Sequence, residues 1–314
     1  MNTQRLLFIF LIIVALACTK RESIQNEKAD VSLVILGTVQ DAGSPHIGCK
    51  KKCCSDLFGK PNHNRKVVSL GVFDRKNNKT FLFEATPNIA EQLKELKLFA
   101  NKENELPDGI LLTHAHIGHY AGLMYLGKEA INADKVPVYA MPKMQEFLKA
   151  NGPWNQLITL KNIELKNLKA EEKIELTSKV FVTPLIVPHR DEYSETVGFK
   201  IETANKKVLF IPDIDKWEKW QQIIGLIKEC DYAFIDGTFF DGSEVNHRNI
   251  SEIPHPFIVE SMQVFKNLSA SNKAKVHFIH FNHTNPLLNY DSKAYDIVLE
   301  SGFKISKNGN SYEL

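Results

Sequence analysis

The stretch Thr113-His114-Ala115-His116-Ile117-Gly118-His119-Tyr120 places three histidines directly after the apolar run Gly109–Leu112. A short apolar run of this kind predicts a buried strand. His114 and His116 are two residues apart, so their side chains point the same way from an extended segment, while His119 begins the following helix. Several neutral imidazoles at one strand end suit a borderline metal such as zinc. The alternative is a loop that is rich in histidine by chance.

Further candidate ligands stand where later apolar runs end. They are His189, Asp213, His280 and His283. Because these residues recur at strand ends, the sequence favours a shared metal site over a chance histidine-rich loop.

Short apolar, β-branched runs recur along the chain and later alternate with segments of helical period. The predicted strands are Val31–Leu36, Val67–Phe73, Thr80–Phe83, Gly109–Thr113, Val136–Ala140, Val180–Val187, Val197–Glu202, Lys207–Ile211, Tyr232–Ile235 and Val276–His280. We expect two sheets faced by helices, an αβ/βα sandwich of the α+β class, over residues 31–314 as one domain. Asn308-Gly309 predicts a hairpin turn between Lys304–Lys307 and Ser311–Leu314.

The first 18 residues differ from the rest of the chain. The apolar run from Leu6 to Leu16 follows Arg5 and falls well short of the roughly 20 residues of a spanning helix, so it predicts a signal peptide over residues 1–18. Ala15-Leu16-Ala17-Cys18 resembles the bacterial lipobox, in which Cys18 carries lipid, and residues 19–30 would then be a tether. We expect a lipid-anchored protein of the bacterial cell envelope, on its periplasmic or outer surface. The alternative is an uncleaved or ordinarily cleaved secretory segment.

The composition is that of an ordinary globular protein. Of 314 residues, 43% are hydrophobic, and 39 basic against 37 acidic residues leave a formal net charge of +2. This excludes disordered, collagen-like and coiled-coil chains. It also argues against nucleic acid as a partner, since no broad basic excess is available to neutralise phosphates. A small anionic substrate held at a metal remains compatible with this charge.

Three cysteines, Cys49, Cys53 and Cys54, lie within six residues of one another. Disulfides are the usual role of cysteine in an exported protein, but an odd cluster this tight cannot pair completely within itself. Three thiolates so close together commonly share a metal, so a structural zinc site stands beside disulfides or free thiols as an alternative. Cys230 follows an apolar segment and is predicted to be a buried core residue.

The order of these residues resembles the metallo-β-lactamase superfamily: H-x-H-x-x-H, then a histidine, an aspartate and a C-terminal histidine, each after a strand. Within it, the chain is most similar to the branch that contains the PQQ biosynthesis protein B and the phosphoribosyl cyclic phosphodiesterases. The supporting stretches are Leu36–Gly43 with the cysteines behind it, Phe83–Pro87, Asp236–Phe240, Glu252–His255 and Ile279–Pro286. The PQQ protein has largely replaced the histidine triad. This chain keeps it, which favours metal-dependent hydrolysis over the PQQ role.

The resemblance implies two kinds of metal site. Carried over by position, the first catalytic metal would bind His114, His116 and His189, and the second His119, His280 and a bridging Asp213. Cys49, Cys53, Cys54 and His283 would form a structural zinc site, although the cysteine spacing differs from the family's C-x-C-x-x-C, and His280 and His283 could exchange roles. One or two catalytic zinc ions and one structural zinc ion are therefore expected, with Mn²⁺ as an alternative catalytic metal.

Gly118 departs from the superfamily motif, which has aspartate at this position as a ligand of the second metal. The resemblance therefore implies weak or single-metal occupancy, with Asp41 and Glu84 as candidate substitutes and Glu84 better suited to orienting a ligand histidine. If the loop tolerates a side chain, Gly118→Asp is expected to tighten the second metal. The alternative is that glycine is required there by a positive φ or by packing against the substrate.

His255 lies where related enzymes bring a histidine towards the leaving group, so the resemblance makes it a candidate general acid beside the catalytic Asp213. A capping role at a helix start is the alternative for His255. The function implied is a zinc-dependent hydrolase of a small phosphodiester or related ester, acting through a metal-activated hydroxide on a small anionic substrate. The competing hypothesis is a non-hydrolytic accessory or metal-binding lipoprotein like the PQQ protein B.

Overall fold

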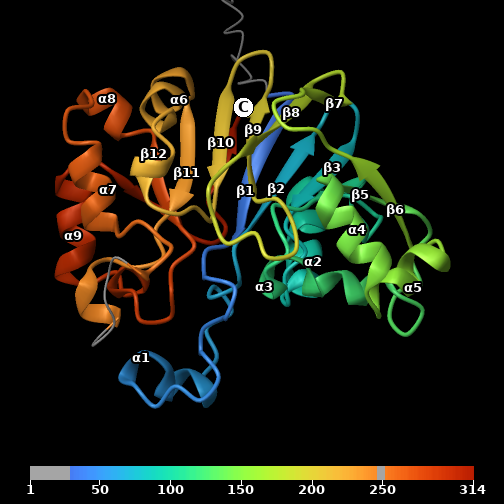
Figure 1. Cartoon of the computed structure of the whole chain (residues 1–314), viewed down its shortest axis with the longest axis horizontal. Helices are drawn as coiled ribbons and strands as arrows, with labels where there is room; N and C mark the ends of the chain where they lie inside the picture. The colour runs from blue at the N-terminus through green and yellow to red at the C-terminus, as the bar shows by residue number, and fades with distance from the viewer. Residues whose placement is uncertain (1–28, 246–251) are drawn as a thin grey trace, which may run out of the picture.

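The structure, a computed structural model, describes residues 29–245 and 252–314 (Figure 1). The predicted signal peptide, Cys18 and most of the predicted tether lie outside the described residues. Within the described ranges, no helix combines the length and the apolar character needed to cross a bilayer.

Across residues 29–245 and 252–314, fourteen strands form two seven-stranded sheets. The first sheet has the order β14-β1-β2-β3-β4-β5-β6 and consists of β1 (Val31–Gly37), β2 (Ser69–Asp74), β3 (Lys79–Phe83), β4 (Gly109–Leu111), β5 (Val136–Ala140), β6 (Ile163–Asn167) and β14 (Ser311–Glu313). The second has the order β13-β12-β11-β10-β9-β8-β7 and consists of β7 (Ile174–Thr177), β8 (Val180–Ile186), β9 (Val197–Glu202), β10 (Lys207–Ile211), β11 (Tyr232–Asp236), β12 (Val276–Ile279) and β13 (Lys304–Ile305).

Helices cover the outer face of each sheet. Figure 1 shows α2–α5 on one side of the two sheets and α7–α9 on the other, while α1 lies apart from both. The helices are α1 (Lys52–Ser55), α2 (Ile89–Ala100), α3 (Ile117–Tyr120), α4 (Pro142–Ala150), α5 (Trp154–Thr159), α6 (Ile223–Glu229), α7 (Ile258–Val264), α8 (Ala270–Lys273) and α9 (Lys293–Glu300). Short 3₁₀ turns are η1 (Asp56–Phe58), η2 (Ala121–Leu126), η3 (Trp217–Lys219), η4 (Gly242–Val245) and η6 (Pro286–Leu288).

Alternate residues of the central strands enter different hydrophobic layers. In β1, Leu33 and Ile35 pack between the two sheets, whereas Val34 and Leu36 pack under the helices of the first sheet. In β10, Phe210 faces the layer between the sheets and Ile211 faces the helices of the second sheet. Strands buried on both faces in this way read as continuous apolar runs, which is why the sequence revealed them. The predicted αβ/βα sandwich is confirmed.

The predicted C-terminal hairpin is wrong. Gly309 does turn the chain with a φ of 82°. However, β13 pairs with β12 in the second sheet, and β14 pairs antiparallel with β1 in the first. The turn contacts β1, since the Gly309 N–H donates to the Ile35 carbonyl at 2.8 Å. It does not join two paired strands. The segment therefore connects the two sheets at their edges.

The topology brings several strand ends together. Strands β3 and β4 run parallel in the first sheet, and β10, β11 and β12 run parallel in the second. Their carboxyl ends carry Glu84, the His114–His119 segment, Asp213, Asp236 and His280. These polar residues follow buried strands directly, so the two sheets position them rigidly at one edge of the sandwich.

Candidate metal centres

The three histidines assigned to the first metal lie together. His114, His116 and His189 each offer a ring nitrogen, and these three atoms lie within 4.8 Å of one another. The Thr113 hydroxyl lies 2.8 Å from Nδ1 of His114 and orients the ring so that Nε2 faces the site. Burial lowers the pKa of His189 to about 4, which keeps the imidazole neutral, as a ligand must be.

Asp213 stands at the centre of the histidine cluster. Its Oδ2 lies 2.9 Å from Nε2 of His119 and 3.2 Å from Nε2 of His280. Its Oδ1 lies 3.7 Å from Nε2 of His189. Because Oδ2 also lies 3.9 Å from Nε2 of His114, the Asp213 carboxylate contacts imidazoles of both proposed metal groups.

Two further residues fix the orientation of these imidazoles. The Thr238 hydroxyl lies 2.8 Å from Nδ1 of His280, which leaves Nε2 directed at Asp213. Glu84 is fully buried, and its Oε2 lies 3.5 Å from Nδ1 of His119, on the opposite side of that ring from Asp213. Glu84 thus occupies the orienting position proposed for it from the sequence.

Several buried atoms of the cluster have no hydrogen-bond partner among the described residues. These atoms include Nε2 of His114, His116 and His189, the three residues assigned to the first metal. A buried polar atom without a partner costs about 1–3 kcal/mol, so three such nitrogens lying together require an explanation. Imidazole and carboxylate donors are the ligands that zinc takes in proteins. The residues present therefore fit the metal pair that the resemblance implies.

His255 approaches the cluster from the segment before α7. Its Nδ1 lies 2.8 Å from Oδ2 of the buried Asp236 and 3.6 Å from Oδ1 of Asp213. Burial alone would lower the pKa of His255, but the Asp236 and Asp213 carboxylates outweigh burial and raise it. The N-cap of α7 is Phe257, so the alternative capping role of His255 is not seen.

Asp236 and Thr238 were not assigned a role from the sequence. The Thr238 hydroxyl donates to Oδ1 of Asp236 at 2.7 Å, so Thr238 contacts both the partner of His255 and the ligand His280. The only signal for them was the stretch Asp236–Phe240, which carried part of the family resemblance. Their function depends on contacts between residues far apart in the chain.

The cysteine cluster forms a second, separate group. One ligand atom each of Cys49, Cys53, Cys54 and His283 lies within 4.8 Å of the others. The sulfurs of Cys49 and Cys53 are 4.0 Å apart and those of Cys53 and Cys54 are 3.9 Å apart, far beyond a disulfide bond. His280 lies at Asp213 and His283 at the cysteines, which is the arrangement first expected and not the exchanged one.

The thiols of this cluster are suited to a cation. Burial, reinforced by the neighbouring Cys54 and Cys49 sulfurs, raises the pKa of Cys53 to about 12. Three thiolates at this spacing repel one another, so a divalent cation is needed to hold them ionised. The backbone N–H of His46 donates to Sγ of Cys54 at 3.3 Å, as is usual around a metal-binding thiolate.

Gly118 does not leave an open ligand position. A Cβ atom at residue 118 would lie 2.2 Å from Cβ of Asp41 and 2.6 Å from its Cα. The loop therefore does not tolerate a side chain at residue 118. The expectation that Gly118→Asp would tighten the second metal depended on such tolerance, and it is corrected here. Close packing is the reason for glycine here.

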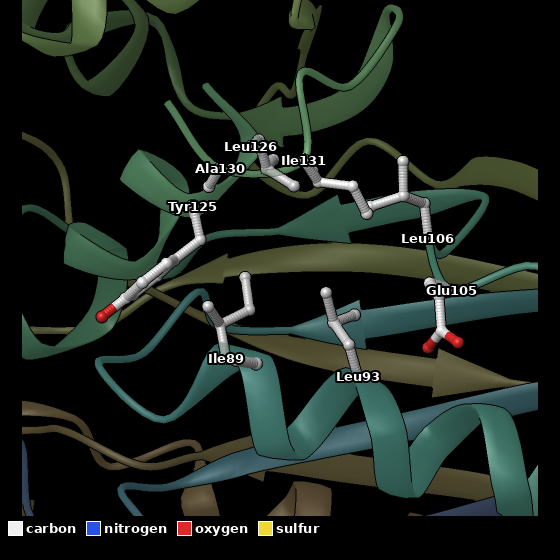
Figure 2. A pocket seen from close by; sticks show the side chains of 9 residues that line it. Ile89, Leu93, Glu105, Leu106, Tyr125, Leu126, Ala130 and Ile131 are labelled. Atoms are coloured by element: carbon white, nitrogen blue, oxygen red, sulfur yellow. The ribbon is translucent and has the colours of Figure 1, made fainter. Parts of the chain in front are cut away.

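An apolar pocket lies away from the histidine cluster, between α2 and the region around η2. It has a volume of about 240 Å³, and Figure 2 shows Ile89 and Leu93 facing Leu126 and Ile131 across it. Its lining contains no histidine or cysteine and one carboxylate, that of Glu105. It lacks the groups that metal-dependent chemistry needs, so the histidine cluster is the candidate reaction centre.

A two-sheet αβ/βα sandwich with a histidine and aspartate cluster at its strand ends is the architecture of the metallo-β-lactamase fold. The chain belongs to the β-lactamase superfamily, since the beta-lactamase superfamily domain matches residues 79–281. The superfamily predicted from the sequence is confirmed.

Similar proteins come from the branch that the sequence suggested. Coenzyme PQQ synthesis protein B of Acinetobacter baumannii (strain SDF) is 22% identical over 308 residues, which cover 90% of this chain and 99% of that protein. The same protein of Methylococcus capsulatus is 23% identical over 311 residues, covering 88% and 97%.

Two solved structures share the fold. Zn²⁺-bound PqqB from Methylobacterium extorquens has a TM-score of 0.74 and 21% identity, with coverage of 90% of this chain and 100% of that chain. A diphosphatase from the PhnP family has a TM-score of 0.64 and 21% identity, with coverage of 90% and 97%.

Proposed function

We propose that the protein is a zinc-dependent hydrolase of a small phosphodiester or related ester. The observation that carries the proposal is Asp213, whose carboxylate lies between the imidazoles of His119 and His280 and that of His189. A carboxylate in this position would be a ligand available to both metals of a two-metal hydrolytic site. When bound, the metals supply an activated water and stabilise negative charge on the substrate.

The chain's own residues form a small cavity beside this cluster. It has a volume of about 190 Å³ and is lined by Gln40, Arg190, Thr238, Phe239, Ile253, Pro254, His255 and Asn282. Its size suits a small molecule, and the Arg190 guanidinium offers donors that match the oxygens of a phosphate or carboxylate. Asp236 holds His255 through Nδ1, so Nε2 is the nitrogen left to donate a proton to a leaving oxygen.

We expect His255→Asn to slow the hydrolysis of a phosphodiester with an alkyl leaving group by ~10²-fold, the lower end for general acid catalysis. A nitrophenyl ester should be slowed far less, because nitrophenolate leaves without being protonated. Steady-state rates of both substrates with the metal-loaded protein check this. An equal loss for both substrates would show that His255 positions other groups and donates no proton.

A second candidate function is a non-hydrolytic accessory role. The similarity to proteins named for coenzyme PQQ synthesis supports it. The clustering of one ring nitrogen each of His114, His116 and His189 within 4.8 Å of one another supports hydrolysis instead, because metal-dependent hydrolysis needs such a set of ligands and the accessory role does not. Metal content separates the two: the accessory role predicts metal at the cysteine cluster alone.

We further propose that the protein is anchored through lipid on Cys18 to the bacterial cell envelope. The support is the short apolar run that ends at Ala17-Cys18. Cys18→Ser is expected to prevent both lipid attachment and cleavage before residue 18, so that the variant keeps the mass of the full, unlipidated precursor. Membrane partitioning and precursor mass check this, and a variant that fractionates and is processed like the native chain would contradict lipidation.

A further inference from the structure

We propose that Asp41 supplies the carboxylate ligand that Gly118 cannot, so that the second metal is held by Asp41, His119, His280 and the bridging Asp213. This inference rests on the proposed metal centre. A carboxylate oxygen of Asp41 and ring nitrogens of His119 and His280 all lie within 4.8 Å of one another. The cluster therefore contains a second carboxylate that arrives from a different part of the chain.

The packing of Gly118 explains why the two positions belong together. A Cβ at residue 118 would meet Cβ of Asp41 at 2.2 Å and its backbone oxygen at 2.6 Å. Real Cβ atoms do not approach this closely, so any side chain at 118 would displace Asp41. Gly118 is not among the glycines with positive φ. Its lack of a side chain is thus required by the approach of Asp41 and not by an unusual backbone.

Asp41 is held at the site by the backbone on either side of the cluster. Val39 forms β-bridges with both Val67 and Phe281, and the Gln40 N–H donates to the Phe281 carbonyl at 2.8 Å. Phe281 directly follows the ligand His280, so the same bridge fixes Asp41 and His280 relative to each other. The Gln40 side-chain amide donates to Oδ1 of Asp41, so the neighbouring side chain holds the carboxylate in place.

Glu84, the other acid that the sequence offered, cannot take this role. It contacts Nδ1 of His119, whereas the metal-facing nitrogen is Nε2, which lies beside Asp213. The imidazole ring therefore stands between Glu84 and the proposed second metal. Glu84 orients His119, and Asp41 is left as the additional carboxylate ligand.

The first test is the isosteric variant Asp41→Asn, measured by calorimetric titration of the metal-free full chain with Zn²⁺ and by metal content after dialysis. The native chain should hold two metals in the histidine cluster besides one at the cysteines. Asp41→Asn should weaken one of these by ~10²-fold or more, since even residues that only support a ligand cost 10–100-fold in metal affinity. Asp291→Asn, an exposed aspartate on a surface loop, is the control and should bind metal as the native chain does.

The second test changes Gly118 itself. Gly118→Asp should lose the second metal, because the new Cβ would collide with the Cβ, Cα and backbone oxygen of Asp41 and displace it. If Gly118→Asp does not fold, Asp41→Asn still decides the matter, because it changes no volume. An unchanged second metal in Asp41→Asn, or a tighter one in Gly118→Asp, would overturn the proposal.

These outcomes are separate from those of the proposed function. Loss of the second metal in Asp41→Asn supports the ligand role even if the native protein hydrolyses no phosphodiester. A native chain that binds only one metal in the histidine cluster overturns the ligand role while leaving single-metal hydrolysis intact.

Discussion

Asp213→Asn is expected to reduce metal-dependent hydrolysis by at least ~10³-fold. Removing a single preorganised electrostatic contact commonly costs 10²–10³ in turnover, and Asp213 faces both proposed metal positions. Asparagine keeps the size of the side chain but removes its charge and presents an amide to the imidazoles. The variant should therefore bind less metal in the histidine cluster as well, which elemental analysis would show.

Asp215→Asn is the matched control for this variant. Asp215 lies two residues further along the same loop, but its carboxylate pairs with Lys219 instead of the histidines. It should retain metal and activity near the native level. A comparable loss of metal and activity in both variants would mean that the site depends on the loop as a whole and not on the Asp213 carboxylate.

Cys53→Ser is expected to remove one metal and to destabilise the segment that carries α1. Bound structural zinc contributes on the order of 10 kcal/mol to folding where little core is present. The segment around α1 has little hydrophobic core of its own. Figure 1 shows α1 apart from both sheets, and among residues 46–64 Cys54 is the only buried one. We expect a lower melting temperature and proteolytic cleavage between residues 46 and 64, with the histidine cluster still loaded.

Cys230→Ala provides the comparison for Cys53→Ser. Cys230 is buried in the core of the second sheet and belongs to neither group of clustered ligands. Its loss should leave the metal content unchanged and cost only the packing of one small side chain. A Cys53→Ser variant with a native melting curve and full zinc would show that the cysteines hold no structural metal.

The strand ends were predictable because strands that are buried on both faces consist of continuous apolar residues. Phe210 and Ile211 are covered on opposite faces, so β10 appears as an apolar run and its end points to Asp213. The strands β6 and β7 were missed, because their exposed residues interrupt the apolar pattern. The same limitation affected the C-terminus, where a local turn signal gave no information on which sheet each strand would join.

Contacts between distant residues were harder to predict. Asp41 was one of two substitutes for the missing aspartate, and nothing in its spacing placed it against Gly118. That placement depends on the bridges of Val39 to Val67 and Phe281, which come from three separate parts of the chain. Asp236 and Thr238 were overlooked for the same reason, because they act by contacting His255 and His280.

Hydrolysis of bis(4-nitrophenyl) phosphate by the zinc- or manganese-loaded protein, measured beside the metal-free form and Asp213→Asn, tests the proposed hydrolase activity most directly. We expect turnover that requires metal and that falls at least ~10³-fold in the variant. Absence of turnover with either metal, in a native chain whose histidine cluster is shown by elemental analysis to be loaded, would contradict the proposed hydrolysis.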